Sequence, residues 1–208
     1  MKEDRYCFTN ACAAVIEEAS PHILKPIAKT DWGNWTDWKN CGVNEVAIGY
    51  KFTWEPPQGK GGGGRDDSGG NGFWLRCSNE SNGYLIGHSG KWNQGMKEDN
   101  CEKGSYVNAI EINSEPNQMN DDDMALTNVK IWCRNPINGQ ETQLPTPPAT
   151  MVSSGIWTGK NSCPPFFAVS GVRVKIQQYQ HGWDDTMLNK IELRCTHILS
   201  FIEAIFVN

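Results

Sequence analysis

Two glutamates and one glutamine occupy equivalent places along the chain. Glu55, Glu115 and Gln177 each stand fourteen residues after a cysteine, namely Cys41, Cys101 and Cys163. Two carboxylates can cleave or transfer a glycosidic bond when they lie about 5 to 9.5 Å apart and the surroundings keep one of them protonated. Because an amide cannot exchange a proton, catalysis would depend on Glu55 and Glu115. The three side chains, with Trp54, could instead bind a sugar, or they could be strand ends that face water.

Pairs of aspartates precede the other three cysteines of the same segments. Asp66-Asp67, Asp122-Asp123 and Asp184-Asp185 lie eleven and ten residues before Cys77, Cys133 and Cys195. Carboxylates ligate hard cations and accept hydrogen bonds from sugar hydroxyls, but they also cap turns. Threefold recurrence favours the turn, because a turn that defines the fold must recur in every copy. The triplet Asp121, Asp122 and Asp123 is the best place for a metal ion, and nothing else in the sequence calls for a cofactor.

These positions belong to a unit that occurs three times. After the first cysteine of each copy comes a run of alternating apolar and polar residues, at 46–54, 106–112 and 169–176. Apolar residues also stand four and two places before each second cysteine. Both patterns have period two and predict strands with one buried face. The unit is therefore a segment rich in Trp or Gly, a cysteine, a strand, an acidic turn, a strand and a second cysteine.

Four tryptophans recur within this unit and the others do not. Trp32, Trp35, Trp92 and Trp157 share their offset from a first cysteine with a tryptophan of another copy. This recurrence favours packing in the core or between sheets over a role in ligand binding. Trp54 has no counterpart in every copy and is freer to contact a ligand.

Eight cysteines indicate a disulfide framework and an oxidising compartment. The simplest pairing gives one bond per copy, Cys41–Cys77, Cys101–Cys133 and Cys163–Cys195, and leaves Cys7 to pair with Cys12, although sequence alone leaves other pairings open. Asn34 and Asn79 begin glycosylation sequons. No signal peptide is visible in the charged first residues, but the chain could be a mature form. We expect a secreted, extracellular protein.

The fold class follows from the repeat. If each copy makes one small sheet with one apolar face, three sheets can bury those faces around a pseudo-threefold axis, which gives an all-β prism. We expect an N-terminal extension at 1–30, with a short helix over 12–19, a prism at 31–196 and a C-terminal tail at 197–208. The copies span 31–80, 81–136 and 150–196.

Composition excludes two classes of function. The chain has 208 residues, a net charge of −5 and no basic run, so nucleic acid is not an expected partner. No window approaches the roughly 18 apolar residues that a transmembrane helix needs.

The chain resembles the vitelline membrane outer layer protein 1 family, which carries the phrase DDTALNxIxLxC three times. The stretches Gly64–Cys77 and Trp183–Cys195 carry the resemblance, which extends over residues 30–196. Thr127 stands where the family usually has Asn. The resemblance implies a β-prism of type I with three Greek-key-like sheets, a shape shared with jacalin-like plant lectins. It also implies secretion, a place in an extracellular coat and carbohydrate binding, with a lysozyme-like transfer activity in the founding member.

Three functional hypotheses follow. We favour a secreted glycan-binding or structural coat protein, whose partners are glycans or extracellular-matrix glycoproteins. The second is a chito-oligosaccharide transferase or hydrolase that uses Glu55 and Glu115. The third is a defence or toxin protein in which the apolar tail at 198–207 inserts into a target while a lectin-like prism recognises a sugar.

Overall fold

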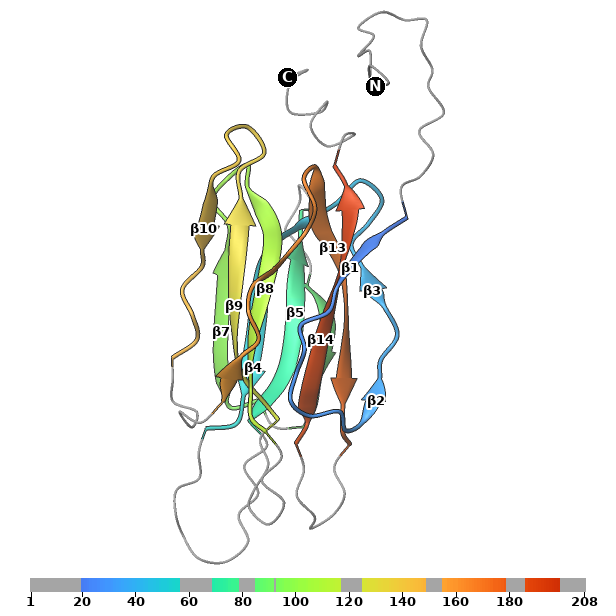
Figure 1. Cartoon of the computed structure of the whole chain (residues 1–208), viewed down its shortest axis with the longest axis vertical. Helices are drawn as coiled ribbons and strands as arrows, with labels where there is room; N and C mark the ends of the chain where they lie inside the picture. The colour runs from blue at the N-terminus through green and yellow to red at the C-terminus, as the bar shows by residue number, and fades with distance from the viewer. Residues whose placement is uncertain are drawn as a thin grey trace, which may run out of the picture.

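The structure is a computed structural model that describes residues 20–56, 69–78, 85–91, 93–116, 125–148, 155–178 and 186–198. Within these ranges all regular secondary structure is β-strand, in three sheets (Figure 1). The predicted all-β class is therefore confirmed. Several predicted features lie outside the described residues: the helix over 12–19, Cys7 and Cys12, the three aspartate pairs and the triplet, Asn79, Trp92 and the tail after residue 198.

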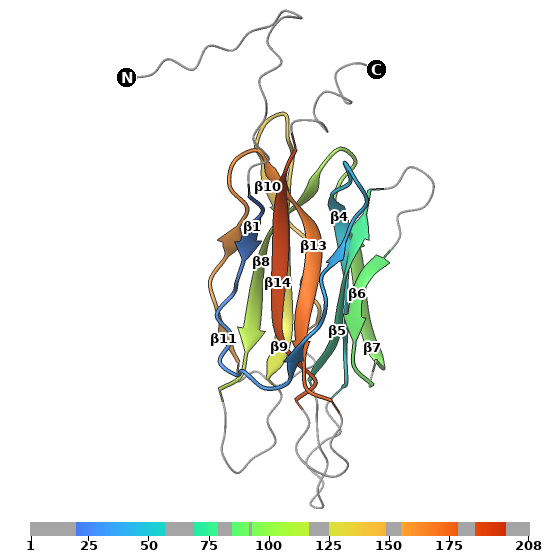
Figure 2. The ribbon, with the colours of Figure 1, turned by 90° about the vertical axis from the view of Figure 1, so that its right-hand side faces the viewer.

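Each sheet is built on one long antiparallel hairpin from one copy of the repeat. The hairpins pair β4 (Ala47–Trp54) with β5 (Gly70–Cys77), β8 (Tyr106–Ser114) with β9 (Leu126–Arg134), and β13 (Phe167–Ile176) with β14 (Leu188–His197). The strands coincide with the predicted alternating runs. Their inward side chains, including Phe52, Ile112 and Val174 at one shared offset, form a single hydrophobic core. The sheet of β13 and β14 stands between the other two in Figure 2.

Strands that precede a hairpin in sequence pair with the hairpin of another copy. β7 (Gly95–Asn100) precedes the second hairpin but pairs with β4, while β11 (Ile156–Trp157) and β12 (Asn161–Ser162) precede the third but pair with β8. β2 (Asn34–Trp35) and β3 (Lys39–Asn40) precede the first and pair with β13. The expectation that each copy makes its own sheet is therefore wrong, because each sheet draws its strands from two copies.

The outer strands complete the three sheets. β6 (Leu85–Ser89) pairs with β5 and β10 (Glu141–Gln143) with β9, each next along the chain. β1 (His22–Leu24) instead pairs with β14, and Leu24 is buried in the core. Residues 22–24 thus belong to the sheet of the last hairpin, earlier in the chain than the expected boundary at residue 31.

The three predicted disulfides are confirmed, and each joins two sheets. The bonds are Cys41–Cys77, Cys101–Cys133 and Cys163–Cys195. The backbone N–H groups of Cys41, Cys101 and Cys163 donate to carbonyls of β13, β4 and β8, at Ser170, Ile48 and Asn108 respectively. Each of these cysteines is thus held to one sheet by its backbone and to the next by its sulfur. The disulfides therefore fasten the prism at its corners.

Two β-bulges recur at equivalent places in every hairpin. One interrupts the first strand at Ile48, Asn108 and Ser170, and the other interrupts the second strand at Asn71, Thr127 and Asn189. A bulge bends its strand and increases the local twist. Each of the three hairpins therefore has the same two bulges. Together these six bulges give all three sheets the curl that lets them enclose one core.

The second bulge explains an asparagine of the repeated phrase. The amide nitrogens of Asn71 and Asn189 each donate, at 3.2 Å, to the carbonyl two residues earlier, at Gly69 and Met187. Gly69 and Met187 have positive φ angles of 65° and 42°, so the asparagine fixes a left-handed turn residue. Thr127 cannot reach back in this way, and its hydroxyl lies 2.7 Å from the Oδ1 of Asn113 instead.

Replacement of this asparagine is expected to weaken the fold. Asn189→Ala removes the donor to the Met187 carbonyl and to the Thr186 hydroxyl, which lies 2.8 Å from the Asn189 amide. We expect the free energy of unfolding to fall by about 1–3 kcal/mol, because two buried hydrogen bonds are lost. Urea denaturation followed by tryptophan fluorescence measures the change. Asn138→Ala, on an exposed turn, is the control, and an equal effect of the two substitutions would contradict this role.

Candidate functional site

The three residues predicted as a polar set follow β4, β8 and β13 directly, at one end of the prism. We call it the hairpin end, and it is the lower end in Figure 1. The backbone N–H groups of Glu55, Glu115 and Gln177 donate to the carbonyls of Gly69, Ala125 and Met187, at 2.9, 2.7 and 2.8 Å. The three positions are therefore equivalent in structure as well as in sequence.

Two of these three side chains are buried and do not face the solvent. The side chains of Glu55 and Glu115 are only 5% and 2% exposed, so the alternative of strand ends that face water is wrong for both. Buried carboxylates need polar partners, and both residues have further interactions within the chain. Gln177 is less buried, and its Oε1 accepts a 2.6 Å hydrogen bond from the hydroxyl of Thr186. Trp54 is buried against Phe52, so its indole offers no open face to a sugar.

A groove of about 370 Å³ opens at the hairpin end between the sheet of β13 and the sheet of β5. We call it the hairpin-end groove. Eight of its lining residues have polar or aromatic side chains: Asn34, Trp35, Thr36, His88, Ser89, Lys91, Gln177 and Gln178. Its volume lies in the range of small-molecule sites. Of the predicted polar set only Gln177 lines this groove, and Glu55 and Glu115 do not.

The lining suits a sugar. The side-chain amides of Asn34 and Gln178 form no hydrogen bond with another described residue, so each can both donate to and accept from a hydroxyl. The indole of Trp35 is 37% exposed and gives the site an aromatic group. The prediction that Trp35 packs between sheets is therefore wrong, because the ring lies on the outer face of its sheet.

Close contacts with β13 hold β2 in place as one wall of the groove. The backbone N–H of Thr36 donates to the carbonyl of Val174 at 2.9 Å, and its hydroxyl lies 3.1 Å from both that carbonyl and the Val174 nitrogen. The Trp35 ring lies 4.5 Å from the guanidinium of Arg173. Gly33 has a φ of 79°, and a Cβ there would lie 2.2 Å from the carbonyl oxygen of Ile176. Only glycine therefore lets the chain enter β2 this close to β13.

An ion-pair cluster fixes the segment that leads into β2. The carboxylate of Asp31 lies 2.6 Å from the ammonium of Lys175 and 2.7 Å from that of Lys190. Hydrogen bonds from these two lysines lower the pKa of Asp31 from 3.8 to about 2. The first strands are thus attached to β13 and β14 electrostatically as well as by backbone pairing.

The stacking of Trp35 on a cation has a counterpart at Trp157. Trp157, which has the same offset from its cysteine, belongs to another sheet than Trp35. Its ring lies 3.7 Å from the ammonium of Lys130. In the sheet of β4 and β5, the cation and the ring both come from the hairpin itself. Lys51 lies 5.1 Å from the ring of Trp74. The outer faces therefore share aromatic–cation stacking, whereas Trp35 alone of the stacked tryptophans named here also lines the hairpin-end groove.

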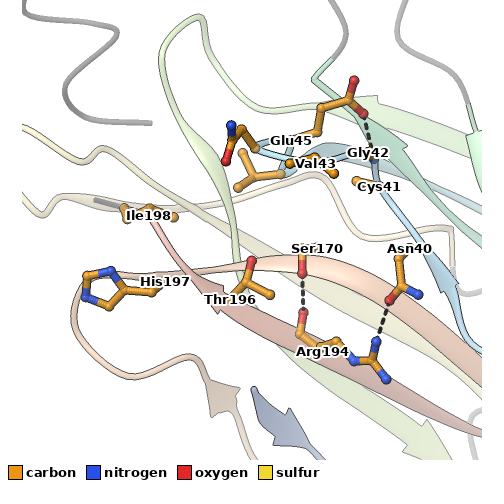
Figure 3. A pocket seen from close by; sticks show the side chains of 12 residues that line it. Asn40, Cys41, Gly42, Val43, Glu45, Ser170, Arg194, Thr196, His197 and Ile198 are labelled. Carbon is orange, nitrogen blue, oxygen red and sulfur yellow. Dashed lines mark hydrogen bonds between the residues drawn. The ribbon is translucent and has the colours of Figure 1, made fainter. Parts of the chain in front are cut away.

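A second cavity, of about 290 Å³, lies at the opposite end beside the loop after β3 (Figure 3). Its polar groups bind one another: Arg194 Nη1 donates to Asn40 Oδ1 at 2.9 Å, and the N–H of Gly42 donates to a Glu45 carboxylate oxygen at 2.9 Å. These bonds hold the loop in place. The hairpin-end groove, whose amides are open, is the better candidate site.

Comparison with known proteins decides the family. The family model described as vitelline membrane outer layer protein I matches residues 22–198. The chain belongs to this family. The vitelline membrane outer layer protein 1 homolog of Mus musculus is 28% identical over 165 residues, which cover 76% of each protein. The family match begins at residue 22, where β1 begins, and ends at Ile198, so it covers the whole prism.

Solved lectin structures share the fold. Calystegia sepium agglutinin matches with a TM-score of 0.51 and 13% identity over 85% of this chain and 97% of its own. Calsepa lectin, solved in complex with a biantennary N-glycan, gives 0.52 and 13% with the same coverage. A variant of a Malaysian banana lectin gives 0.50 and 8% over 86% of this chain and 99% of its own. The predicted β-prism is confirmed.

Two further observations bear on partners. No helix among the described residues is long and apolar enough to span a membrane. The described residues hold no group of three metal-ligating side chains, and the predicted cation site at Asp121–Asp123 lies outside them.

The Asp31 cluster predicts a defined response to acid. Because the pKa of Asp31 is lowered in the folded chain, its contribution to stability is complete above pH 3.8 and is lost as the pH falls towards 2. NMR titration should place its carboxyl midpoint near 2, and Asp31→Asn should remove its share of the fall in melting temperature over this range. Asp37→Asn controls for the loss of one exposed carboxylate. A midpoint near 3.8 for Asp31 would contradict the cluster.

Proposed function

We propose that this protein is a secreted, extracellular glycan-binding protein of the vitelline membrane outer layer type, and that it holds a sugar in the hairpin-end groove. One observation carries the proposal: Asn34, Trp35 and Gln178 all line one groove, the amides of Asn34 and Gln178 are open, and the indole of Trp35 is exposed. Three disulfides support an oxidising, extracellular location. Its partners would be glycans or the glycoproteins of an extracellular coat.

The chemistry of the groove favours binding over cleavage. A glycosidase of the usual kind needs two carboxyl groups that flank the scissile bond. None of the described residues that line the groove is Asp or Glu, whereas amides, hydroxyls and an indole are all present. These groups can orient and hold a sugar, and the lining includes no pair of carboxyl groups. The structural role in a coat is compatible with the same binding, because a coat protein must hold its neighbours.

A glycosyl-transferring enzyme is the second candidate, because Glu55 and Glu115 are both buried at equivalent positions of the hairpin end. Our proposal predicts no product when the protein is incubated with N-acetylchito-oligosaccharides, as followed by mass spectrometry. Product that is formed by the natural chain and lost in both Glu55→Gln and Glu115→Gln would establish the enzyme instead. The defence or toxin hypothesis depends on the tail at 198–207, of which the structure describes only the buried Ile198.

The binding proposal is tested at Trp35. A glycan array first selects a ligand, and calorimetry then compares variants. Trp35→Ala should weaken binding about 3- to 10-fold, as expected for one aromatic contact of roughly 0.5–1.5 kcal/mol, and Gln178→Ala should weaken it in the same direction. The matched control is Trp157→Ala, which removes an equivalent stacked ring away from the groove. The proposal fails if no array sugar and no chitin is retained, or if both tryptophan variants bind like the natural chain.

A further inference from the structure

The glycosylation sequon Asn34-Trp35-Thr36 is itself a wall of the hairpin-end groove. All three of its residues line the groove, and Asn34 is exposed. We propose that Asn34 carries an N-linked glycan and that this glycan covers the groove, so that only chains with an unmodified Asn34 bind a separate sugar. The inference that Asn34 is modified is supported by the sequon and by the exposure of Asn34. The inference that the glycan blocks the groove also rests on the proposed function.

The folded structure has room for the modification. β2 is at the edge of its sheet, and among the described strands it pairs only with β13. The Asn34 amide forms no hydrogen bond with another described residue, so a sugar on Nδ2 breaks no contact among them. A glycan can therefore leave the sheet at Asn34 without displacing a strand.

The order of synthesis gives the sequon time to be modified. In the folded chain the hydroxyl of Thr36 is bonded to the backbone of Val174, which lies 138 residues later in the sequence. Domains fold as their parts emerge during synthesis. β2 thus has no partner until nearly the whole prism has been made. During that interval the sequon is an unpaired segment, which is the form in which an acceptor asparagine is accessible.

Geometry then makes the attached glycan an occupant of the groove. Its first sugar is bonded to a lining residue, beside the indole of Trp35 and close to the amides of Gln177 and Gln178. A ligand tethered by a short linker acts at an effective concentration on the order of millimolar. A free sugar that binds weakly would therefore compete poorly with the attached one.

The test uses the full chain with Asn79→Gln, which removes the second sequon, made in two hosts. One host is a secreting eukaryotic cell, and the other is a bacterium that forms disulfides but adds no glycan. Peptide mass spectrometry should find a glycan on Asn34 in the first product. With N-acetylchitotetraose and a biantennary N-glycan as probes, the glycosylated chain should bind at least about 10-fold more weakly than the bare chain.

Trimming the glycan locates its blocking part. An endoglycosidase that leaves one N-acetylglucosamine on Asn34 should leave binding weak. An amidase that removes the whole glycan should raise binding above that of the trimmed chain but below that of the bare chain, because it converts the lining amide of Asn34 to a carboxylate that cannot donate. An unmodified Asn34 in the secreted chain would overturn the inference, as would equal probe binding by the two products. If Asn34 is modified and neither product binds any probe, the gating fails together with the proposed function, while the mass data uphold the modification alone.

Discussion

The prism depends on the pairing of the first described strands with the last hairpin. β1, β2 and β3 form the edges of a sheet whose centre is β13 and β14. Joining segments so far apart in sequence costs loop-closure entropy and is slow to form. Three kinds of contact between these segments and their neighbours offset this cost. They are the ion pairs of Asp31 with two lysines, the stacking of Trp35 on Arg173, and the disulfide from Cys41 to the next sheet. Without this closure the last hairpin would stand as two strands with both edges unpaired.

The three corners of the prism share their backbone features but differ in their side chains. The backbone devices recur in all three copies: the cysteine frame, the paired bulges and the left-handed residue before the second strand. The side chains after the first strand do not recur, since Gln177 stands where the other copies have buried glutamates. The backbone features recur because three sheets can share one core only if their backbones match. The side chain that differs, Gln177, is the member of the set that lines the hairpin-end groove.

Sequence predicted the hairpins and disulfides well because both have local or periodic signals. The alternating runs placed all six central strands, and equal offsets between cysteines gave the three bonds. The exchange of strands between copies was not predictable from these signals. β2 is only two residues long, too short for a period, and its partner lies more than 130 residues away. Trp35 was misplaced for a related reason, because recurrence at one offset indicates a structural role but does not say which face of the sheet a ring occupies.

Fold alone does not assign a function to this chain. The lectins that superimpose on it are 8–13% identical, and a shared architecture hosts unrelated activities. The choice between binding and catalysis therefore rests on where the acids lie. Glu55 and Glu115 are buried and do not line the hairpin-end groove, whereas the amide at the third equivalent position does. At the one position of the set that meets the groove, the chain has a side chain that can hold a hydroxyl and cannot move a proton. An amide at this position is compatible with the binding of a sugar hydroxyl, and it cannot serve as the acid or the base of a catalytic pair.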